Sequence, residues 1–217
     1  REHGTDPAAS VALDTLAADH PGPVRVERDP GNPGFGAGCN ALAAGSDAEH
    51  LLFLNPDAEI VDWPYRADAP PPSAAITGPL MVDSGHPGAH AGTSYRIRDE
   101  VARSWLRRRG SLPDGRGFVS GAALLVDRAS FERLGGFDEG YFLFYEDIDL
   151  CLRANDAGVA THVDRRWTVR HAGAHSTAPR FGDSLIWSYE SALRFHGRRG
   201  SPLWAYRTYV VADAAMR

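Results

Sequence analysis

The chain has 217 residues, of which 43% are hydrophobic and 24% are charged, so a globular domain with its own core is expected. Its net charge of -5 gives no electrostatic reason to expect a nucleic-acid partner, because such partners usually require a basic face. No apolar run reaches the roughly 18 to 20 residues of a membrane span and no secretory leader opens the chain, which predicts a cytoplasmic protein, or one held peripherally at the inner face of the membrane.

The first part of the chain alternates predicted helices and strands. Residues 10–19 space their apolar side chains as on one face of a helix. A short strand over 23–29, a glycine-rich turn over 31–38 and a short helix over 39–44 follow. The run from His50 to Ile60 is largely apolar without alternation, which is typical of a strand buried in a parallel sheet. This order predicts an α/β sheet with crossover connections.

The later part continues the pattern with longer elements. A proline-rich loop over 62–75 precedes a strand over 74–84. Residues 99–109 suggest either a basic amphipathic helix or an ordered loop over a cleft. The stretch 117–158 predicts a strand, a helix, a glycine turn, an aromatic run and another helix. A late strand is predicted over 160–173.

The tail from Ser184 to Arg217 predicts two amphipathic helical pieces, separated by the Gly- and Pro-containing stretch 197–202. Its aromatic residues are interspersed with arginines. Packing back onto the domain is the simpler interpretation. Peripheral membrane contact, or a homodimer formed through these helices, is the alternative.

Asn55 and Asp57 belong to an Asn-Pro-Asp tripeptide near the end of the apolar run. In open α/β sheets, ligands bind at the carboxyl ends of the strands. A carboxylate there, with a second oxygen donor two residues earlier, suits a hard divalent cation that holds phosphates. The tripeptide alone is explained as well by an Asx-turn that caps the strand.

Three acids, Glu146, Asp147 and Asp149, follow an aromatic run over 141–145. On a helix Glu146 and Asp149 share a face, and Asp147 points about 100° away from Glu146. A favourable acidic helix start, with Asp149 paired to Arg153, explains part of the pattern. A carboxylate beside apolar rings is also desolvated, which raises its pKa and suits it to general-base catalysis.

Two histidines, His171 and His175, follow the late strand. They are not a helical metalloprotease pair, because Gly173 interrupts them and no glutamate follows the first. From the residues alone, a histidine here is more often structural than a ligand.

Each motif is weak alone, but their order along the chain is specific. It runs from the Gly/Asn turn and Asn-Pro-Asp through GAALLV and GGFDE to EDIDLCLR and a strand that ends in histidine. This order resembles the inverting glycosyltransferases of family 2, which have the GT-A fold, and most closely their rhamnosyltransferase-like branch. The resemblance covers about residues 31–177, and FDEGYFLFYEDIDLCLRANDAG is its most specific block.

The resemblance implies an α/β fold of the GT-A type, with a Rossmann-like sheet that is mixed but mostly parallel and is flanked by helices. It implies a glycosyltransferase domain over 1–180 and a C-terminal helical extension over 181–217. In the family, further strands at the start hold the nucleotide base. Here only residues 3–10 resemble a remnant of the second of their turns, and we expect residues to precede Arg1.

The resemblance also implies roles for particular residues. Asp147 would be the general base for the acceptor hydroxyl, with Glu146 in support. Asp57 and His171 would bind the metal, although Asn55 stands where the more familiar motif has aspartate, which leaves metal dependence open. The residues implied to hold the donor or line its pocket are Asn32, Gly34, Phe35, Gly38, Asn40, Asn55, Asp57, Ser120, Gly121, Ala122 and Asp138.

The implied cofactor is a divalent cation, Mn²⁺ or Mg²⁺, and the implied donor is a dTDP- or UDP-sugar, with L-rhamnose as one candidate sugar. The acceptor would be a hydroxyl of a glycan, a lipid-linked molecule or a small molecule. Inverting displacement needs one catalytic carboxylate, unlike the two of a retaining hydrolase. The charge that develops on the leaving diphosphate needs a cation or fixed dipoles.

Two other functions are alternatives. A non-catalytic GT-A-like module that binds a nucleotide-sugar or a protein is favoured by Asn55 and by the absence of the first nucleotide-binding strand. A dinucleotide-dependent oxidoreductase fits poorly, because the glycines at 34–38 give G-x-G-x-G rather than G-x-G-x-x-G.

Overall fold

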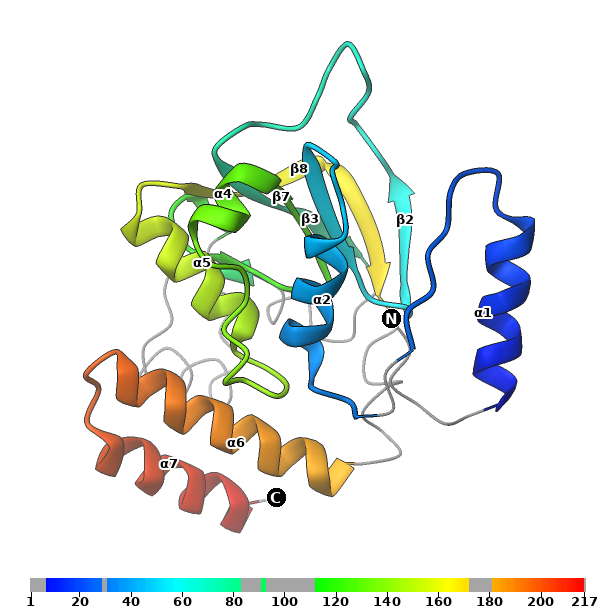
Figure 1. Cartoon of the computed structure of the whole chain (residues 1–217). Helices are drawn as coiled ribbons and strands as arrows, with labels where there is room; N and C mark the ends of the chain where they lie inside the picture. The colour runs from blue at the N-terminus through cyan, green and yellow to red at the C-terminus, as the bar shows by residue number, and fades with distance from the viewer. Residues whose placement is uncertain (1–6, 29–30, 83–90, 93–111, 172–180, 217) are drawn as a thin grey trace.

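The computed structural model describes residues 7–28, 31–82, 91–92, 112–171 and 181–216 (Figure 1). The segment 99–109 and His175 lie outside these ranges. The elements in chain order are α1 (Pro7–Asp19), α2 (Phe35–Ala44), β1 (His50–Leu54), β2 (Ala58–Asp62), β3 (Ala75–Val82), β4 (Ala91–Gly92), β5 (Asp114–Gly115), β6 (Phe118–Val119), β7 (Ala123–Asp127), α4 (Arg128–Arg133), α5 (Glu146–Asp156), β8 (Ala160–His171), α6 (Phe181–Arg198) and α7 (Leu203–Met216).

The main sheet has the strand order β1-β7-β3-β8-β2, with β5 added beside β8. A mixed sheet flanked by helices is therefore confirmed. The expectation that it is mostly parallel is wrong for the described strands, because β3 and β8 form the parallel pair and the remaining pairs are antiparallel. The cause is that β7 runs backwards between β1 and β3, while β2 folds back to lie beside the end of β8.

The single strand predicted over 50–60 is two strands, β1 and β2, separated by the Asn-Pro-Asp turn. Pro56 has no N–H for a ladder, and Asn55 closes the turn by accepting a hydrogen bond at 3.1 Å from the Ala58 N–H. Buried and exposed side chains alternate along β1, so this strand is not covered on both faces. The prediction of complete burial is wrong, because the apolar run carries leucine on the exposed face as well.

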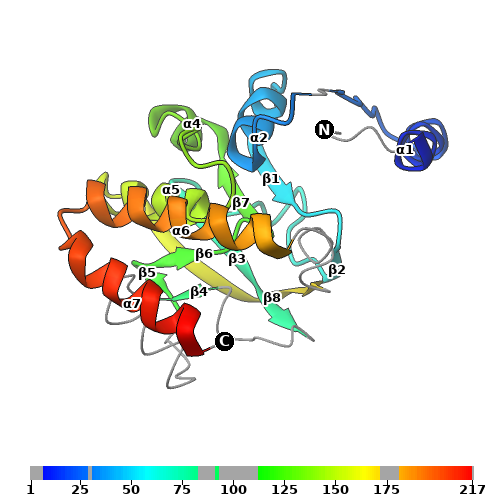
Figure 2. The same cartoon turned by 90° about the horizontal axis from the view of Figure 1, so that it is seen from below.

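Helix α1 is confirmed, but its apolar side chains are not packed: Val11 is 64% exposed and Leu16 is 58% exposed. Both views show α1 apart from the sheet (Figures 1 and 2). The strand predicted over 23–29 is wrong for its described part, because residues 23–28 form no strand apart from one bridge residue at Arg28. A strand needs a neighbouring ladder, and the described residues supply none there.

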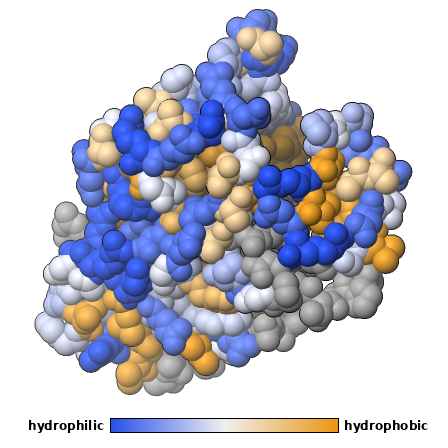
Figure 3. Space-filling view, viewed as in Figure 1, coloured by the Kyte–Doolittle hydropathy of each residue, from blue (hydrophilic) through white to orange (hydrophobic). Residues whose placement is uncertain are grey.

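The two predicted C-terminal helices, α6 and α7, are confirmed and pack back onto the domain. Phe195, Tyr206 and Tyr209 are buried in the same hydrophobic cluster as the sheet residues. Trp204 and Val211 stay 72% and 70% exposed, and apolar atoms lie on the surface over α7 (Figure 3). Within the described ranges, no helix is both long enough and apolar enough to span a bilayer.

Candidate active site

The Asn-Pro-Asp turn and the end of β8 meet at one edge of the sheet. Ala58, the first residue of β2, pairs with His171, the last residue of β8. This pairing brings Asp57 Oδ1 to 3.2 Å from His171 Nε2, with both side chains largely buried. The pairing of β2 with β8 thus brings together two residues that lie 114 positions apart in the sequence (171 minus 57).

The surroundings of Asp57 and His171 indicate whether this pair could bind a metal ion. Asp57 Oδ1 is buried and accepts no hydrogen bond among the described residues. The described part of the chain contains no cluster of three or more His, Cys, Asp or Glu side chains suited to a metal. A carboxylate suits Mg²⁺ or Mn²⁺, ions that often complete their shell with substrate phosphates and water. Asp57 and His171 therefore fit a cation held jointly by the protein and a diphosphate.

Asp147 lies in the first turn of α5 and is half-buried. Its carboxylate accepts hydrogen bonds at 2.7 Å from the Gly121 N–H and at 2.7 Å from the Ile148 N–H. Burial raises the pKa of Asp147 above its usual value, although these N–H groups and the Ser120 side chain pull it down. The group is therefore a stronger base than a solvated aspartate, and it is held in one orientation.

Glu146 is only 5% exposed, and its Oε2 has no hydrogen-bond partner among the described residues. Burial, followed by the neighbouring charge of Asp147, raises the pKa of Glu146 well above its usual value. Glu146 therefore faces the protein interior, whereas Asp147 faces residues 120–121. The paired acids differ in environment, which separates their chemical roles.

The segment 120–122 connects the Asn-Pro-Asp turn to Asp147. Gly121 binds Asp147, and the Ala122 carbonyl accepts a hydrogen bond at 2.9 Å from the Asn55 N–H. A side chain at position 121 would meet the Phe35 ring at 3.1 Å, so glycine permits this close packing. The structure thus brings the predicted residues of this segment between the Asn-Pro-Asp turn and Asp147.

Two strained residues precede the acids. Phe144 and Tyr145 both have φ of 68°, and Tyr145 is the N-cap residue of α5. Residues with side chains rarely adopt this left-handed conformation, and consecutive examples mark a backbone that its surroundings hold in place. The turn they make sets the direction in which α5, and with it Asp147, begins.

The glycine-rich stretch packs against the protein itself. Helix α2 begins at Phe35, four residues earlier than predicted, and the Phe35 N–H donates to the Phe142 carbonyl at 3.1 Å. At Gly34 (φ 97°) a Cβ would lie 2.3 Å from that same oxygen. Gly38 is buried inside the helix. The need for glycine at position 34 therefore comes from the aromatic segment rather than from a turn open to solvent.

The Asn40 side chain is also hydrogen-bonded within the protein. Its amide donates to the Phe137 carbonyl and accepts from the Phe137 N–H, both at 2.9 Å, and it also donates to Glu139 at 3.0 Å. The Asn40 side chain therefore joins helix α2 to residues 137–139, and its implied contact with the donor remains a prediction. Asn32 has φ of 38° in the turn before α2, and its contact with a donor remains a prediction.

Asp138 is bound by arginines of α6. Its carboxylate pairs with Arg194 at 3.0 Å and with Arg198, and it accepts the Gly140 N–H at 2.9 Å. Burial alone would raise the pKa of Asp138, but Gly140 and the two guanidinium groups outweigh it and lower the pKa. The predicted contact of Asp138 with the donor sugar has no support in this pairing. Its arginine partners were missed because they follow the most recognisable motifs.

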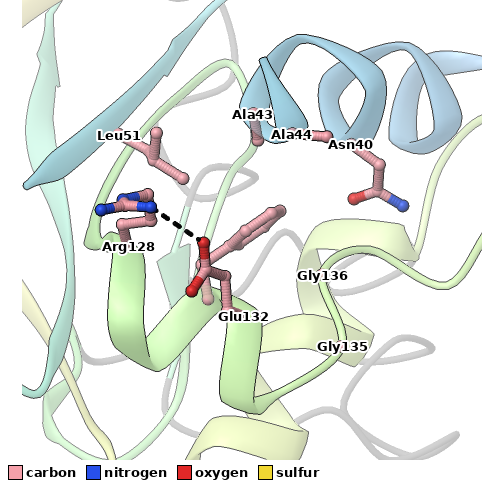
Figure 4. Close-up of a pocket in the computed structure, with 9 residues that line it drawn as sticks. Asn40, Ala43, Ala44, Leu51, Arg128, Glu132, Gly135 and Gly136 are labelled. Atoms are coloured by element: carbon pink, nitrogen blue, oxygen red, sulfur yellow. Dashed lines mark hydrogen bonds and ion pairs between the residues drawn. The ribbon is translucent and has the colours of Figure 1, made fainter. Parts of the chain in front are cut away.

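A cavity of about 240 Å³ lies elsewhere, between α2 and α4 (Figure 4). Leu51 and Phe131 contribute apolar surface, and Arg128 pairs with Glu132 at its rim. Its lining includes neither Asp147 nor Asp57. The cavity is therefore separate from the candidate active site.

Comparisons with known proteins support the same family. No protein-family model matches the chain. Over 82 residues it is 38% identical to rhamnosyltransferase WbbL of Escherichia coli K12, covering 38% of this chain and 31% of that protein. Over 88 residues it is 39% identical to N-acetylglucosaminyl-diphospho-decaprenol L-rhamnosyltransferase of Mycobacterium tuberculosis (strain CDC 1551 / Oshkosh), covering 41% of this chain and 29% of that protein. The chain thus spans about a third of the length of these relatives.

A solved structure shows the same fold. The crystal structure of GalNAc-T7 with UDP, GalNAc and Mn²⁺ superposes with a TM-score of 0.59 at 18% identity, over 78% of this chain and 36% of that one. Uncharacterized protein Rv1525 of M. tuberculosis H37Rv is 27% identical over 209 residues, which cover 91% of this chain and 77% of that protein. The chain therefore has the GT-A fold of this glycosyltransferase structure, and part of its sequence is similar to part of two rhamnosyltransferases.

Proposed function

We propose that the protein is an inverting glycosyltransferase that moves a sugar from a nucleoside-diphosphate donor to an acceptor hydroxyl. The observation that carries the proposal is the placement of Asp147, a half-buried carboxylate of raised pKa that is held by the Gly121 N–H at 2.7 Å. The connection from Gly121 through Ala122 to the Asn55 turn supports it, because it joins this base to the diphosphate side of the site. The rhamnosyltransferase relatives make L-rhamnose from a dTDP donor the first sugar to test.

The reaction is a single displacement. The acceptor oxygen bonds to the anomeric carbon, its proton passes to Asp147, and the bond from that carbon to the diphosphate oxygen breaks. A hydroxyl has a pKa far above 7, so the base must act as the new bond forms. Asp147 is suited to this because burial raises its proton affinity while the backbone N–H groups fix its direction.

Asp57 and His171 would hold a divalent cation, Mn²⁺ or Mg²⁺, together with the donor diphosphate. Bound there, the cation would stabilise the negative charge that develops on the leaving nucleoside diphosphate. The solved neighbour binds UDP and Mn²⁺, which supports this assignment. The residues of the protein supply the orientation: Asp57 is fixed by the β2 turn and His171 by its pairing in β8.

A lipid-linked glycan is the acceptor that the second relative favours, since its name specifies a diphospho-decaprenol substrate. Such an acceptor would bring the protein to a membrane surface from the cytoplasmic side. The exposed Trp204 and Val211 of α7 are the residues through which a peripheral contact would form, and a homodimer through the same helices is the competing prediction.

A non-catalytic binding module is the second candidate, and Asn55 in place of aspartate favours it. The two functions are separated by incubating the protein with dTDP- and UDP-sugars, Mn²⁺ and lipid-linked or soluble glycan acceptors, and by determining the anomeric configuration of the product by NMR. The enzyme releases nucleoside diphosphate in an acceptor-dependent way and inverts the anomeric centre. Metal-independent donor binding with neither transfer nor donor hydrolysis would support the module, and a retained configuration would contradict the single displacement.

A further inference from the structure

The turn before α5 depends on contacts from outside its own segment. Phe144 and Tyr145 are consecutive left-handed residues, each with φ of 68°. Such a conformation costs backbone energy and persists when the surrounding structure determines it. The turn ends at Glu146, directly before Asp147, so anything that holds the turn also sets the position of that carboxylate.

Helix α6 crosses this turn and contacts it at successive residues. Ser191 Oγ donates a hydrogen bond at 2.8 Å to the Leu143 carbonyl. The Trp187 ring packs on Phe142 with 4.7 Å between centroids. In Figure 1, α6 lies along the side of the domain next to the loop that enters α5. The hydrogen bond fixes the carbonyl immediately before the two strained residues.

The same face of α6 also fixes the start of the segment. Arg194 pairs with Asp138 at 3.0 Å, and its guanidinium lies 5.3 Å from the centroid of the Tyr141 ring. Tyr141 is fully buried. A planar guanidinium that contacts both a carboxylate and an aromatic ring restrains orientation as well as distance. Ser191 and Arg194 therefore hold the two ends of the segment 138–143 from one helix.

We propose that α6 is a positioning helix for the base, with Ser191 and Arg194 as positioning residues that act through the 138–145 segment to keep Asp147 on the Gly121 N–H. The inference rests on the proposed role of Asp147. It gives the C-terminal region a part in the transfer step, although the sequence motifs of the active site end before α6. Neither residue contacts the reacting atoms.

The test compares Ser191→Ala and Arg194→Gln with Arg199→Gln, which removes an arginine just after α6 that pairs with Asp156 at 3.2 Å. We expect kcat to fall by about 10- to 100-fold in the first two variants, because small misplacements of a catalytic group are costly. The KM for the donor should stay within about twofold of the wild-type value, by the logic that separates kcat from binding effects. Arg199→Gln should keep the wild-type kcat.

The pH profile distinguishes positioning from general destabilisation. The Gly121 N–H lowers the pKa of Asp147, so loosening that bond raises this pKa and moves the acid limb of kcat to higher pH. Arg194→Lys keeps a cation beside Asp138 but lacks the planar guanidinium, so it should recover part of the lost kcat. Circular dichroism and melting temperature are measured for each variant to show that it is folded.

Two results would overturn the inference. One is an unchanged kcat and acid limb in both Ser191→Ala and Arg194→Gln. The other is a loss that follows melting temperature alone, with no shift of the acid limb and no recovery in Arg194→Lys. Failure of the proposed function is distinguishable, because it would show as an Asp147→Asn variant that still transfers sugar, whatever α6 does.

Discussion

The acids and amides around the active site have contrasting tasks that follow from what each side chain contacts. Asp147 is held by backbone N–H groups, and Asn40 is occupied by the backbone of Phe137. Glu146 lies in the interior, where its Oε2 meets no hydrogen-bond partner within the described part of the chain. Residue type alone did not separate these tasks. The distinction comes from contacts between segments far apart in the sequence.

Replacing Asn40 by alanine tests its structural role. The change leaves the Phe137 N–H and carbonyl without their partner, and we expect the free energy of unfolding to fall by about 1–3 kcal/mol. Chemical denaturation followed by fluorescence measures this loss, and isothermal titration measures the affinity for nucleoside diphosphate, which should not change. Undiminished stability together with lost affinity would instead assign Asn40 to the donor.

The pKa of Glu146 predicts how stability depends on pH. Because this pKa is higher in the folded protein, the stabilisation is present below the unfolded value near 4.5 and is lost as pH rises through the folded value. Glu146→Gln cannot ionise and should gain melting temperature relative to the wild type at pH 8, with little difference at pH 4. Glu190→Gln, at an exposed position of α6, is the control. Equal shifts at both pH values would contradict the raised pKa.

At the scale of elements, the sequence predicted most of the helices and strands from periodicity and from glycine and proline positions. The predictions are wrong where hydrogen-bonded pairing with another strand decides whether a segment is a strand. Residues 23–28 have strand-like composition but no ladder, and the apolar run over 50–60 is divided by its own turn. Strand direction was not readable either, since β7 reverses between two strands that run the same way.

The sequence predicts only part of the candidate site, because only some of its residues stand in recognisable motifs. Asp57, His171 and Asp147 stand next to recognisable strand and helix ends, and the structure brings Asp57 to His171 and Asp147 to Gly121. Ser191 and Arg194 carried no motif. A serine, two arginines and a tryptophan recur on one face of α6 at the spacing 187, 191, 194 and 198, which is a signal for packing against another segment but does not name it.

Gly34→Ala tests the close contact between α2 and the aromatic segment. The new Cβ would lie 2.3 Å from the Phe142 carbonyl and would require φ of 97°, so we expect a loss of at least about 1–3 kcal/mol in the free energy of unfolding. Gly182→Ala is the matched control, because its Cβ would meet nothing within 4 Å on helix α6. We expect that change to be neutral or stabilising by up to about 1 kcal/mol. Equal effects of the two changes would refute the close packing.

At the scale of the whole molecule, the fold brings the ends of β1 and β8 to one edge and sets α5 beside them. One hydrophobic cluster joins this region to α6 and α7, so residues on both sides of position 180 share a core. In the proposed reaction, Asp57 and His171 would hold the cation and the diphosphate, and Asp147 would take the proton. Because different residues carry these two roles, metal binding and proton transfer can be tested separately on one protein.

Removal of the divalent cation tests the diphosphate side. With a chelator we expect lost transfer and weakened binding of nucleoside diphosphate, and added Mn²⁺ should restore both. Asp57→Ala should lower the affinity measured with Mn²⁺ by about tenfold or more, since a metal ligand is lost, and should have little effect in chelator. Glu59→Ala, which removes an exposed partner of Arg170, is the control. Binding that is equally tight with and without metal would contradict a metal site at Asp57.

The proposed role of Asp147 as general base is tested most directly by the turnover of Asp147→Asn, measured beside Asp156→Asn, which alters an acid at the far end of the same helix. An amide cannot take the proton of the acceptor hydroxyl, so we expect kcat to fall by about 10²- to 10⁴-fold with donor affinity unchanged. Asp156→Asn should transfer sugar at the wild-type rate. An Asp147→Asn protein that is folded and keeps the wild-type kcat would show that Asp147 is not the base.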